Sequence, residues 1–166
     1  MQQIASGCFT GVVYHTDRYY AVNRYTKMVY VYEFTNQWKQ CNSFAIESNI
    51  DSWITLGFSN GSLYVCPNGD NKVCIYSLTG QRQGSTGSEG SGEAGLVDLP
   101  CIATSDSDGV VLVADYYNGR LQVLNTRRQW SLVQLEPDVS RPYGALVVGD
   151  KLYVNDLCGL HMYTMD

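Results

Sequence analysis

Charged residues, prolines and long apolar runs are scarce in this chain. Only 16% of its 166 residues are charged and only four are proline. No apolar run approaches the roughly 18 to 20 residues of a membrane-spanning helix, so we expect no membrane partner. Residues 1–15 contain neither a basic segment nor a continuous apolar core, so we expect no signal peptide and a cytoplasmic location. With 11 basic and 16 acidic residues, the net charge of −5 disfavours nonspecific binding to nucleic acid.

Motifs that carry catalysis or hold metals are also missing. There is no CxxC pair, so a zinc ribbon and a thioredoxin-like site are not expected. The sequence also lacks the GxSxG motif of serine hydrolases and the P-loop of nucleotide-binding proteins. His15 and His161 are the only histidines, too few for a three-histidine zinc centre. The sequence therefore predicts no catalytic residue, no metal and no cofactor. Without an export signal, the six cysteines are expected to be buried free thiols; they are Cys8, Cys41, Cys66, Cys74, Cys101 and Cys158.

Tyrosine and glycine are abundant, with 13 and 16 copies, and this composition favours strands joined by turns. An internal repeat supports the same conclusion. Residues 113–124 (VADYYNGRLQVL) align without a gap with 65–76 (VCPNGDNKVCIY) and with 21–32 (AVNRYTKMVYVY). Residues 154–163 (VNDLCGLHMY) match with a turn that is two residues shorter. The shared reference position is occupied by Asn23, Pro67, Asp115 and Asp156, at intervals of 44, 48 and 41 residues.

The match continues into the flanking segments. The dipeptide Asn60-Gly61, a favoured hairpin turn, aligns with Asp108-Gly109. Further along, the Gln-Trp pair that ends at Trp38 aligns with the one that ends at Trp130. Each repeat therefore predicts four short antiparallel strands, and repeats of this length with four strands are typical of β-propeller blades.

We predict an all-β fold, a β-propeller of four four-stranded antiparallel blades in one domain over 1–166. The blades are expected at about 7–48, 49–95, 96–138 and 139–166, with a further strand at 1–6. The expected strands are about 9–15, 18–23, 28–34 and 38–46, then 53–58, 62–66, 72–78 and 81–85, then 100–105, 110–115, 120–126 and 130–135, and finally 143–148, 151–155 and 160–164. The Gly-rich segment 84–95 is expected to be a flexible connection.

The run from Gly80 to Leu124 resembles the NHL repeat of β-propeller proteins. A Gly-rich lead-in is followed by Leu99-Pro100, an apolar strand, Asp108-Gly109, and then the run VADYYNGRLQV from Val113 to Val123. The resemblance implies a propeller, most often of six blades, of the kind found as the recognition module of tripartite-motif proteins. It implies a non-enzymatic module that binds a protein partner, and a substrate-recruiting role if ligase domains precede it in a fuller protein.

Two groups of residues are candidates for a role. Asp115 and Arg120 flank one turn, where the aspartate is expected to accept backbone N–H groups and to pair with the arginine, and Gly109 after Asp108 supplies positive φ. The second group lies at the tips of the turns between second and third strands. Two adjacent tyrosines at such a polar tip cannot both be buried easily. The predicted partner-binding residues are Arg24, Tyr25, Asn68, Asp70, Tyr116, Tyr117 and Asn118.

Two other functions remain open at the level of sequence. RNA binding occurs among NHL propellers, although the acidic net charge argues against it. A metal-dependent lactonase-like enzyme would need several inward-facing oxygen ligands. The candidate calcium ligands are Asp106, Asp115, Asn155 and Asp156, and no ligand spacing singles them out.

The ends of the chain raise the question of ring closure. The fourth repeat contains three strands, and residues 2–6 precede the first inner strand. We expect residues 2–6 to pair with the strand at 160–164, because an unpaired edge promotes aggregation. Three assemblies fit the count of strands: a four-bladed ring of one chain, an eight-bladed ring of two chains, or part of a six-bladed propeller. The protein is thus predicted to be a monomer or a dimer.

Overall fold

Strands and turns make up the part of the chain that the computed structural model describes, which comprises residues 4–48, 52–97, 100–104, 109–135 and 139–165. No helix in these ranges is long and apolar enough to cross a membrane. Asp108, one of the predicted signature residues, lies outside the described residues.

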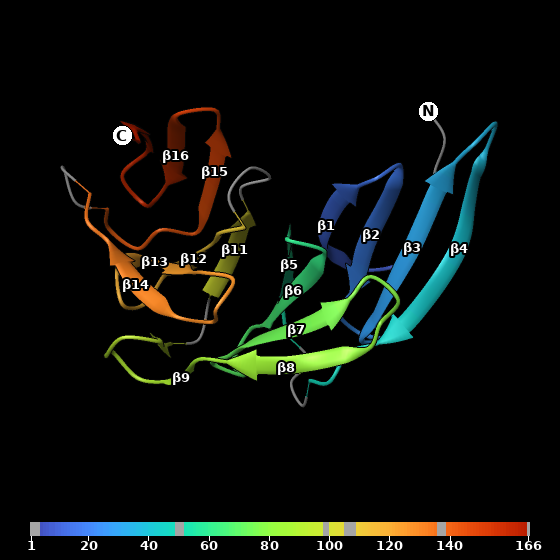
Figure 1. Ribbon diagram of the computed structural model, residues 1–166, viewed down its shortest axis with the longest axis horizontal. Coiled ribbons are helices and arrows are strands. Elements are labelled where there is room, and N and C mark those ends of the chain that lie inside the picture. The colour runs from blue at the N-terminus through green and yellow to red at the C-terminus, as the bar shows by residue number, and fades with distance from the viewer. Residues whose placement is uncertain (1–3, 49–51, 98–99, 105–108, 136–138, 166) are drawn as a thin grey trace.

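The strands form four antiparallel sheets that follow one another along the chain, and each corresponds to one predicted blade (Figure 1). Blade 1 contains β1 (Phe9–His15), β2 (Arg18–Asn23), β3 (Met28–Phe34) and β4 (Trp38–Ala45). Blade 2 contains β5 (Ile54–Ser59), β6 (Ser62–Pro67), β7 (Val73–Ser77) and β8 (Arg82–Thr86). Blade 3 contains β11 (Pro100–Thr104), β12 (Val111–Asp115), β13 (Arg120–Leu124) and β14 (Trp130–Val133), and blade 4 contains β15 (Gly144–Val148), β16 (Lys151–Asn155) and β17 (Leu160–Thr164). The all-β prediction is confirmed, and the strands agree with the expected ranges to within a few residues.

Two-residue turns fix the register of the inner hairpins. Asn60 and Gly61, which close the β5–β6 hairpin, both have positive φ, at 46° and 73°. This is the turn conformation that Asn-Gly favours, so the sequence signal and the structure agree here. The β1–β2 hairpin uses Thr16 and Asp17 instead, at φ of 47° and 59°. A β-branched threonine disfavours that conformation, and the turn is held by the pairing of its strands and by side-chain hydrogen bonds of Thr16 with His15 and of Asp17 with Tyr14.

The connection between blades 2 and 3 is packed rather than loose. It contains a short parallel pair of strands, β9 (Ser88–Glu89) and β10 (Gly95–Leu96). Leu96 is fully buried in the core between the two blades. The expectation of a flexible connection therefore overlooked this docking, which the glycine content of the segment does not predict.

The hydrophobic core lies between adjacent sheets, so each inner blade is buried on both faces. Alternate residues of one strand point to opposite faces. Leu63 of β6 packs towards blade 1, whereas Tyr64 packs towards blade 3. The three clusters lie between blades 1 and 2, blades 2 and 3, and blades 3 and 4. Each sheet is thus stabilised by its neighbours in the order of the chain.

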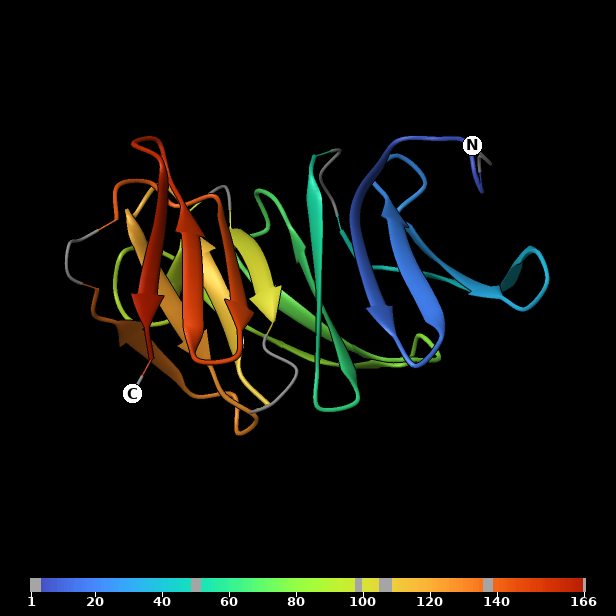
Figure 2. The same cartoon turned by 90° about the horizontal axis from the view of Figure 1, so that it is seen from above.

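The four blades form an open arc, and the two ends of the chain lie at opposite ends of it (Figures 1 and 2). The expected pairing of residues 2–6 with the strand at 160–164 is not formed by the described residues, because β17 pairs only with β16. Residues 4 and 5 instead line a hollow on blade 1. The pairing fails because an arc of four blades keeps blade 1 too far from blade 4. Residues 2 and 3 lie outside the described part of the chain.

Candidate functional site

The turns that carry the predicted tip residues all lie along one edge of the arc. Because the strands of a blade alternate in direction, the turn between second and third strands and the connection to the next blade emerge on the same side. The alternation is visible in blade 4, whose β15–β16 and β16–β17 turns lie at opposite edges (Figure 2). We call the edge that carries the turns between second and third strands the loop face; its described segments are 24–27, 46–48, 52–53, 68–72, 87–97, 116–119, 134–135, 139–143 and 156–159.

The first cluster on the loop face combines an arginine with two aromatic rings. The Arg24 guanidinium lies 4.5 Å from the centre of the Tyr25 ring and 5.4 Å from that of Trp53. The turn is fixed by Asn23, whose side-chain oxygen accepts the backbone N–H groups of Tyr25 and Thr26. Tyr25 is 60% exposed and Trp53 is 55% exposed. Large rings that remain this exposed, with a cation between them, are available to a partner.

The second cluster lies on blade 3 and the connection that follows it. Tyr116 and Tyr117 meet edge to face, with ring centres 5.0 Å apart. The Arg141 guanidinium lies 5.9 Å from the centre of the Tyr116 ring. Tyr117 is 52% exposed, and Tyr116 is half-buried. The loop face therefore presents the same combination twice, a turn tyrosine with an arginine beside it.

Below the second cluster, a buried polar network holds the turn in place. Asp115 is fully buried, and its carboxylate accepts the Nε–H of Arg120 at 3.0 Å. Arg120 also donates to the backbone carbonyls of Ser91, Gly92 and Gly95. The predicted ion pair is therefore present, and it also anchors the Gly-rich connection. These groups are used internally, because each is satisfied by backbone or by another side chain.

Asp156 plays the equivalent part in blade 4. Its carboxylate accepts the backbone N–H groups of Ser140, Cys158 and Gly159, and it lies 3.0 Å from Nε2 of His161. The backbone N–H of Ser140, followed by the His161 contact, holds the pKa of Asp156 well below its usual range, against the opposing effect of burial. Like Asp115, which accepts the N–H of Val97, it ties the incoming connection to the turn.

Not all predicted tip residues belong to the two clusters. The Asn118 side chain donates to Asp115 and to the carbonyl of Gly90, so it belongs to the internal network. Asn68 and Asp70 are half-buried in a turn of blade 2 that carries no aromatic residue. Gly109 has φ of 66°, the positive value that the sequence predicts for it. Arg24, Tyr25, Tyr116 and Tyr117 are the predicted residues that the structure places in the two clusters.

Two residues of these clusters were missed in the sequence. Trp53 and Arg141 come from connections between blades, whereas the prediction considered only turns within a blade. A signal was available, because both connections must reach the loop face once the strand order is known. The repeat alignment points to strands and their turns, and the connections differ too much in length to be aligned.

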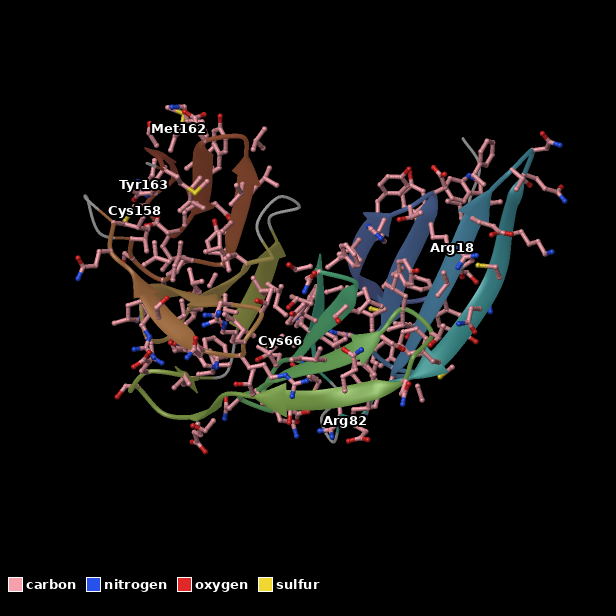
Figure 3. All side chains as sticks on the ribbon, viewed as in Figure 1. Arg18, Cys66, Arg82, Cys158, Met162 and Tyr163 are labelled. Atoms are coloured by element: carbon pink, nitrogen blue, oxygen red, sulfur yellow. The ribbon has the colours of Figure 1, made fainter. Side chains whose placement is uncertain are left out.

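The cysteines are only partly as expected. The five that the structure describes form no disulfide, but only Cys66 and Cys74 are buried. Burial raises the pKa of the Cys74 thiol. Cys41 and Cys158 are exposed, and Cys158 lies in the β16–β17 turn of blade 4 (Figure 3). The side chain of Cys101 lies outside the description.

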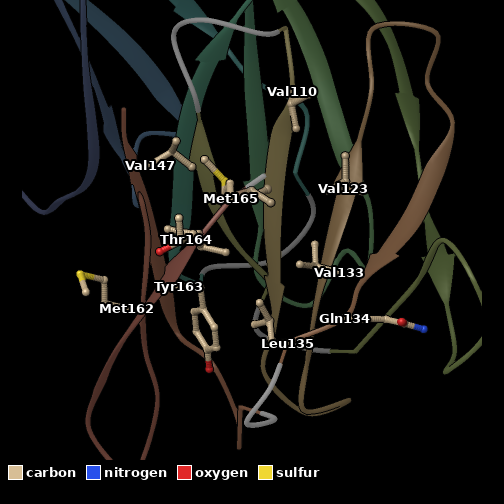
Figure 4. Close-up of a pocket in the computed structure, with 12 residues that line it drawn as sticks. Val110, Val123, Val133, Gln134, Leu135, Val147, Met162, Tyr163, Thr164 and Met165 are labelled. Atoms are coloured by element: carbon tan, nitrogen blue, oxygen red, sulfur yellow. The ribbon is translucent and has the colours of Figure 1, made fainter. Parts of the chain in front are cut away.

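No catalytic arrangement emerges among the residues that the structure describes. They contain no group of three or more His, Cys, Asp or Glu side chains that could hold a metal ion. A hollow of about 580 Å³ opens between blades 3 and 4, but no acidic, basic or thiol side chain lines it (Figure 4). It is walled mainly by aliphatic side chains such as Val123, Val133 and Leu152. The hollow is continuous with the hydrophobic core between blades 3 and 4, to which these side chains belong.

Comparison with known proteins identifies the fold. No protein family model and no curated protein matches the chain. Among solved structures, it is similar to a Bacteroides thetaiotaomicron protein of unknown function, with a TM-score of 0.78 and 14% identity over 95% of this chain and 47% of the other. It is also similar to the Myceliophteria thermophila Cps50 (Swd1) β-propeller domain (TM-score 0.68, 16% identity, 95% and 54% covered) and to a streptogramin B lyase (TM-score 0.64, 16% identity, 95% and 54% covered).

These similarities show a β-propeller fold, and at such low identity they show the fold alone. The chain spans about half the length of each of these three proteins. The predicted propeller is therefore confirmed as a fold, in the form of four consecutive blades.

Proposed function

We propose that this chain is a non-enzymatic β-propeller module that binds a protein partner through its loop face. The observation that carries the proposal is the pair of arginine–aromatic clusters exposed on that face, Arg24 with Tyr25 and Trp53, and Arg141 with Tyr116. Tryptophan, tyrosine and arginine are the residues that dominate the energetics of protein interfaces. Hydrogen bonds to Asn23 and Asp115 hold the turns that carry Tyr25 and Tyr116, so less backbone entropy is lost there when a partner binds.

The NHL resemblance of the run from Gly80 to Leu124 supports the same proposal at a finer level. In that interpretation the chain is an NHL-like recognition module, and within a longer tripartite-motif-like protein it would recruit the substrate of a ubiquitin ligase. The Asp115–Arg120 ion pair then has a structural role, since it fixes the turn that carries Tyr116 and Tyr117. RNA remains the alternative ligand, because exposed arginine–aromatic pairs also stack on bases.

Peptide display tests the proposal without knowledge of the natural partner. Peptides selected on the wild-type chain from a random displayed library should bind at least about tenfold more weakly to the Tyr116→Ala/Tyr117→Ala variant, because truncated hot-spot residues each cost more than about 1 kcal/mol. The Tyr25→Ala/Trp53→Ala variant tests the first cluster in the same way. Leu132→Ala is the matched control, since Leu132 is 53% exposed but lies on the outer strand β14.

Two results would contradict the proposal. The first is full peptide binding by both loop-face variants. The second is tight binding of single-stranded RNA that weakens steeply as salt rises above about 50 mM, which would assign the loop face to RNA instead.

A further inference from the structure

The two sheets at the ends of the arc each expose an apolar face. We call the outer face of blade 1 the N-face; its residues are Val12, Tyr14, Tyr19, Ala21, Tyr32 and Trp38. We call the outer face of blade 4 the C-face; its residues are Leu146, Val148, Tyr153, Leu160 and Met162. Exposure reaches 64% at Val12 and 72% at Leu160, and Met162, which pairs with Tyr153 of the C-face, is 60% exposed.

A shallow hollow lies on each face, and no charged side chain lines either of them. Lys151 is the one charged residue that the strand register places on the C-face, where it pairs with Val148, and its ammonium contacts the Asp150 carboxylate and donates to the Thr164 hydroxyl. A sheet face that stays in water normally carries polar or charged residues. Apolar patches of this kind mark surfaces that another protein surface covers, and charged residues are depleted at the centre of such interfaces. Blades 1 and 4 therefore have the composition of inner blades, buried on both sides.

The repeat shows what kind of surface fits the C-face. Tyr153 occupies the same repeat position as Tyr20, Tyr64 and Leu112. Those three residues are 1%, 6% and 5% exposed, since each lies on the face of its blade that packs against the following blade. Tyr153 is half-buried, because no following blade covers it. The C-face is thus built to pack against the preceding side of another blade.

The N-face is the complementary half of the same contact. Tyr19 occupies the repeat position of Leu63, Val111 and Leu152, which are at most 2% exposed against the preceding blade, whereas Tyr19 is 37% exposed. Trp38 occupies the position of Trp130. Trp130 is buried between blades 2 and 3, and its indole N–H donates to the Thr86 hydroxyl of the preceding blade at 2.8 Å.

We infer that a second copy of this chain covers both faces, with the N-face of each copy on the C-face of the other. The contact continues the three blade-to-blade interfaces inside the chain, and it uses the same repeat positions. The chain covers 54% of the Cps50 β-propeller domain, so two copies supply about as much chain as one whole propeller. Two identical contacts related by a twofold axis then close an eight-bladed ring and leave no open end.

The mass of the protein in solution is the first test. Light scattering on the 166-residue chain at tens of micromolar should give twice the chain mass of 18.5 kDa. A mass of one chain would overturn the inference and assign the faces to other blades. A ladder of higher assemblies would also overturn it, because head-to-tail contacts that do not close produce filaments.

Single substitutions test whether the N-face and the C-face form the contact between the two copies. Leu146→Lys on the C-face and Val12→Asp on the N-face should each reduce the mass to that of one chain. Both residues are exposed within a single copy, at 55% and 64%, so the variants should keep the fold. Leu132→Lys is the matched control, because Leu132 is 53% exposed on β14 and should leave the dimer intact.

Mixing the two monomeric variants distinguishes the arrangement. Their heterodimer has one unaltered contact, and in its other contact the two substituted positions face each other with introduced charges of opposite sign. The mixture should therefore recover the dimer mass. If Val12→Asp stays dimeric while Leu146→Lys does not, two C-faces pack together and the head-to-tail inference is wrong.

Discussion

At the scale of single residues, one repeat position holds the loop-face turns of blades 1, 3 and 4, whereas blade 2 has Pro67 at this position. Asn23, Asp115 and Asp156 occupy that position and are all buried polar side chains. Asn23 accepts backbone N–H groups of its own turn, Asp115 accepts the N–H of Val97 in the connection from the preceding blade, and Asp156 accepts N–H groups of both kinds. A buried carboxylate is stable here because N–H donors replace the water that it loses.

The low pKa of Asp156 gives a pH-dependent prediction. Because this pKa lies below its value in the unfolded chain, the charged carboxylate stabilises the fold above about pH 4, and the stabilisation is lost as the pH falls through the folded value. Asp156→Asn should therefore lower the free energy of unfolding most at pH 7, and its difference from the wild type should shrink below about pH 4. Urea unfolding at several pH values measures this. The exposed Asp150→Asn is the control, and a difference independent of pH would contradict the prediction.

At the scale of elements, the sheets form from local signals, whereas the connection between blades 2 and 3 depends on a distant residue. Arg120 on β13 bonds three carbonyls of the segment that carries β9 and β10. Gln122 on the same strand donates to the carbonyl of Gly95 and accepts the N–H of Ala94. A segment rich in glycine has little tendency to order by itself, so these bonds fix its course.

Removal of Arg120 should release this connection. Arg120→Ala leaves Asp115 buried without its cation, and loss of one partner of a buried ion pair costs about 3 to 5 kcal/mol. We expect a lower melting temperature and faster cleavage after Glu89 and Glu93 by a glutamate-specific protease, measured by mass spectrometry. Arg82→Ala, which removes a more exposed pair with Glu47, serves as the control. Unchanged cleavage would show that the connection is held by Leu96 and not by the polar network.

At the scale of the whole molecule, stability comes from contacts between neighbouring blades. Blades 2 and 3 are covered on both faces, whereas blades 1 and 4 are covered on one face within a single copy. The loop face also depends on the tertiary structure, because Trp53 in the connection between blades 1 and 2 contacts Arg24 in the β2–β3 turn. Both the end faces and the candidate site therefore depend on the order and curvature of the blades.

Hydrogen exchange should follow this division. In the monomeric Leu146→Lys variant, amides of β1 to β4 and β15 to β17 should exchange faster than those of β6, β7, β12 and β13, because the end blades lack a neighbour. In the wild-type dimer, the exchange rates of the end blades should approach those of the inner blades. Exchange that is uniform over all four blades of the monomeric variant would show that the sheets unfold as one unit, contrary to this account.

The sequence alone predicted the features that depend on neighbouring residues. Alternating apolar residues and turn dipeptides such as Asn60-Gly61 fix the strands, and the repeat of these signals gives four blades. The exposed turn residues Tyr25 and Tyr117 were predictable for the same reason. Only the tertiary structure shows that Trp53 and Arg141 lie beside the turn residues and that the Gly-rich connection packs against blades 2 and 3. It also shows that the blades form an open arc, in which the expected pairing of the chain ends is not formed by the described residues. Those features depend on the angle at which one sheet packs on the next, and that angle is set by many side chains from distant segments acting together.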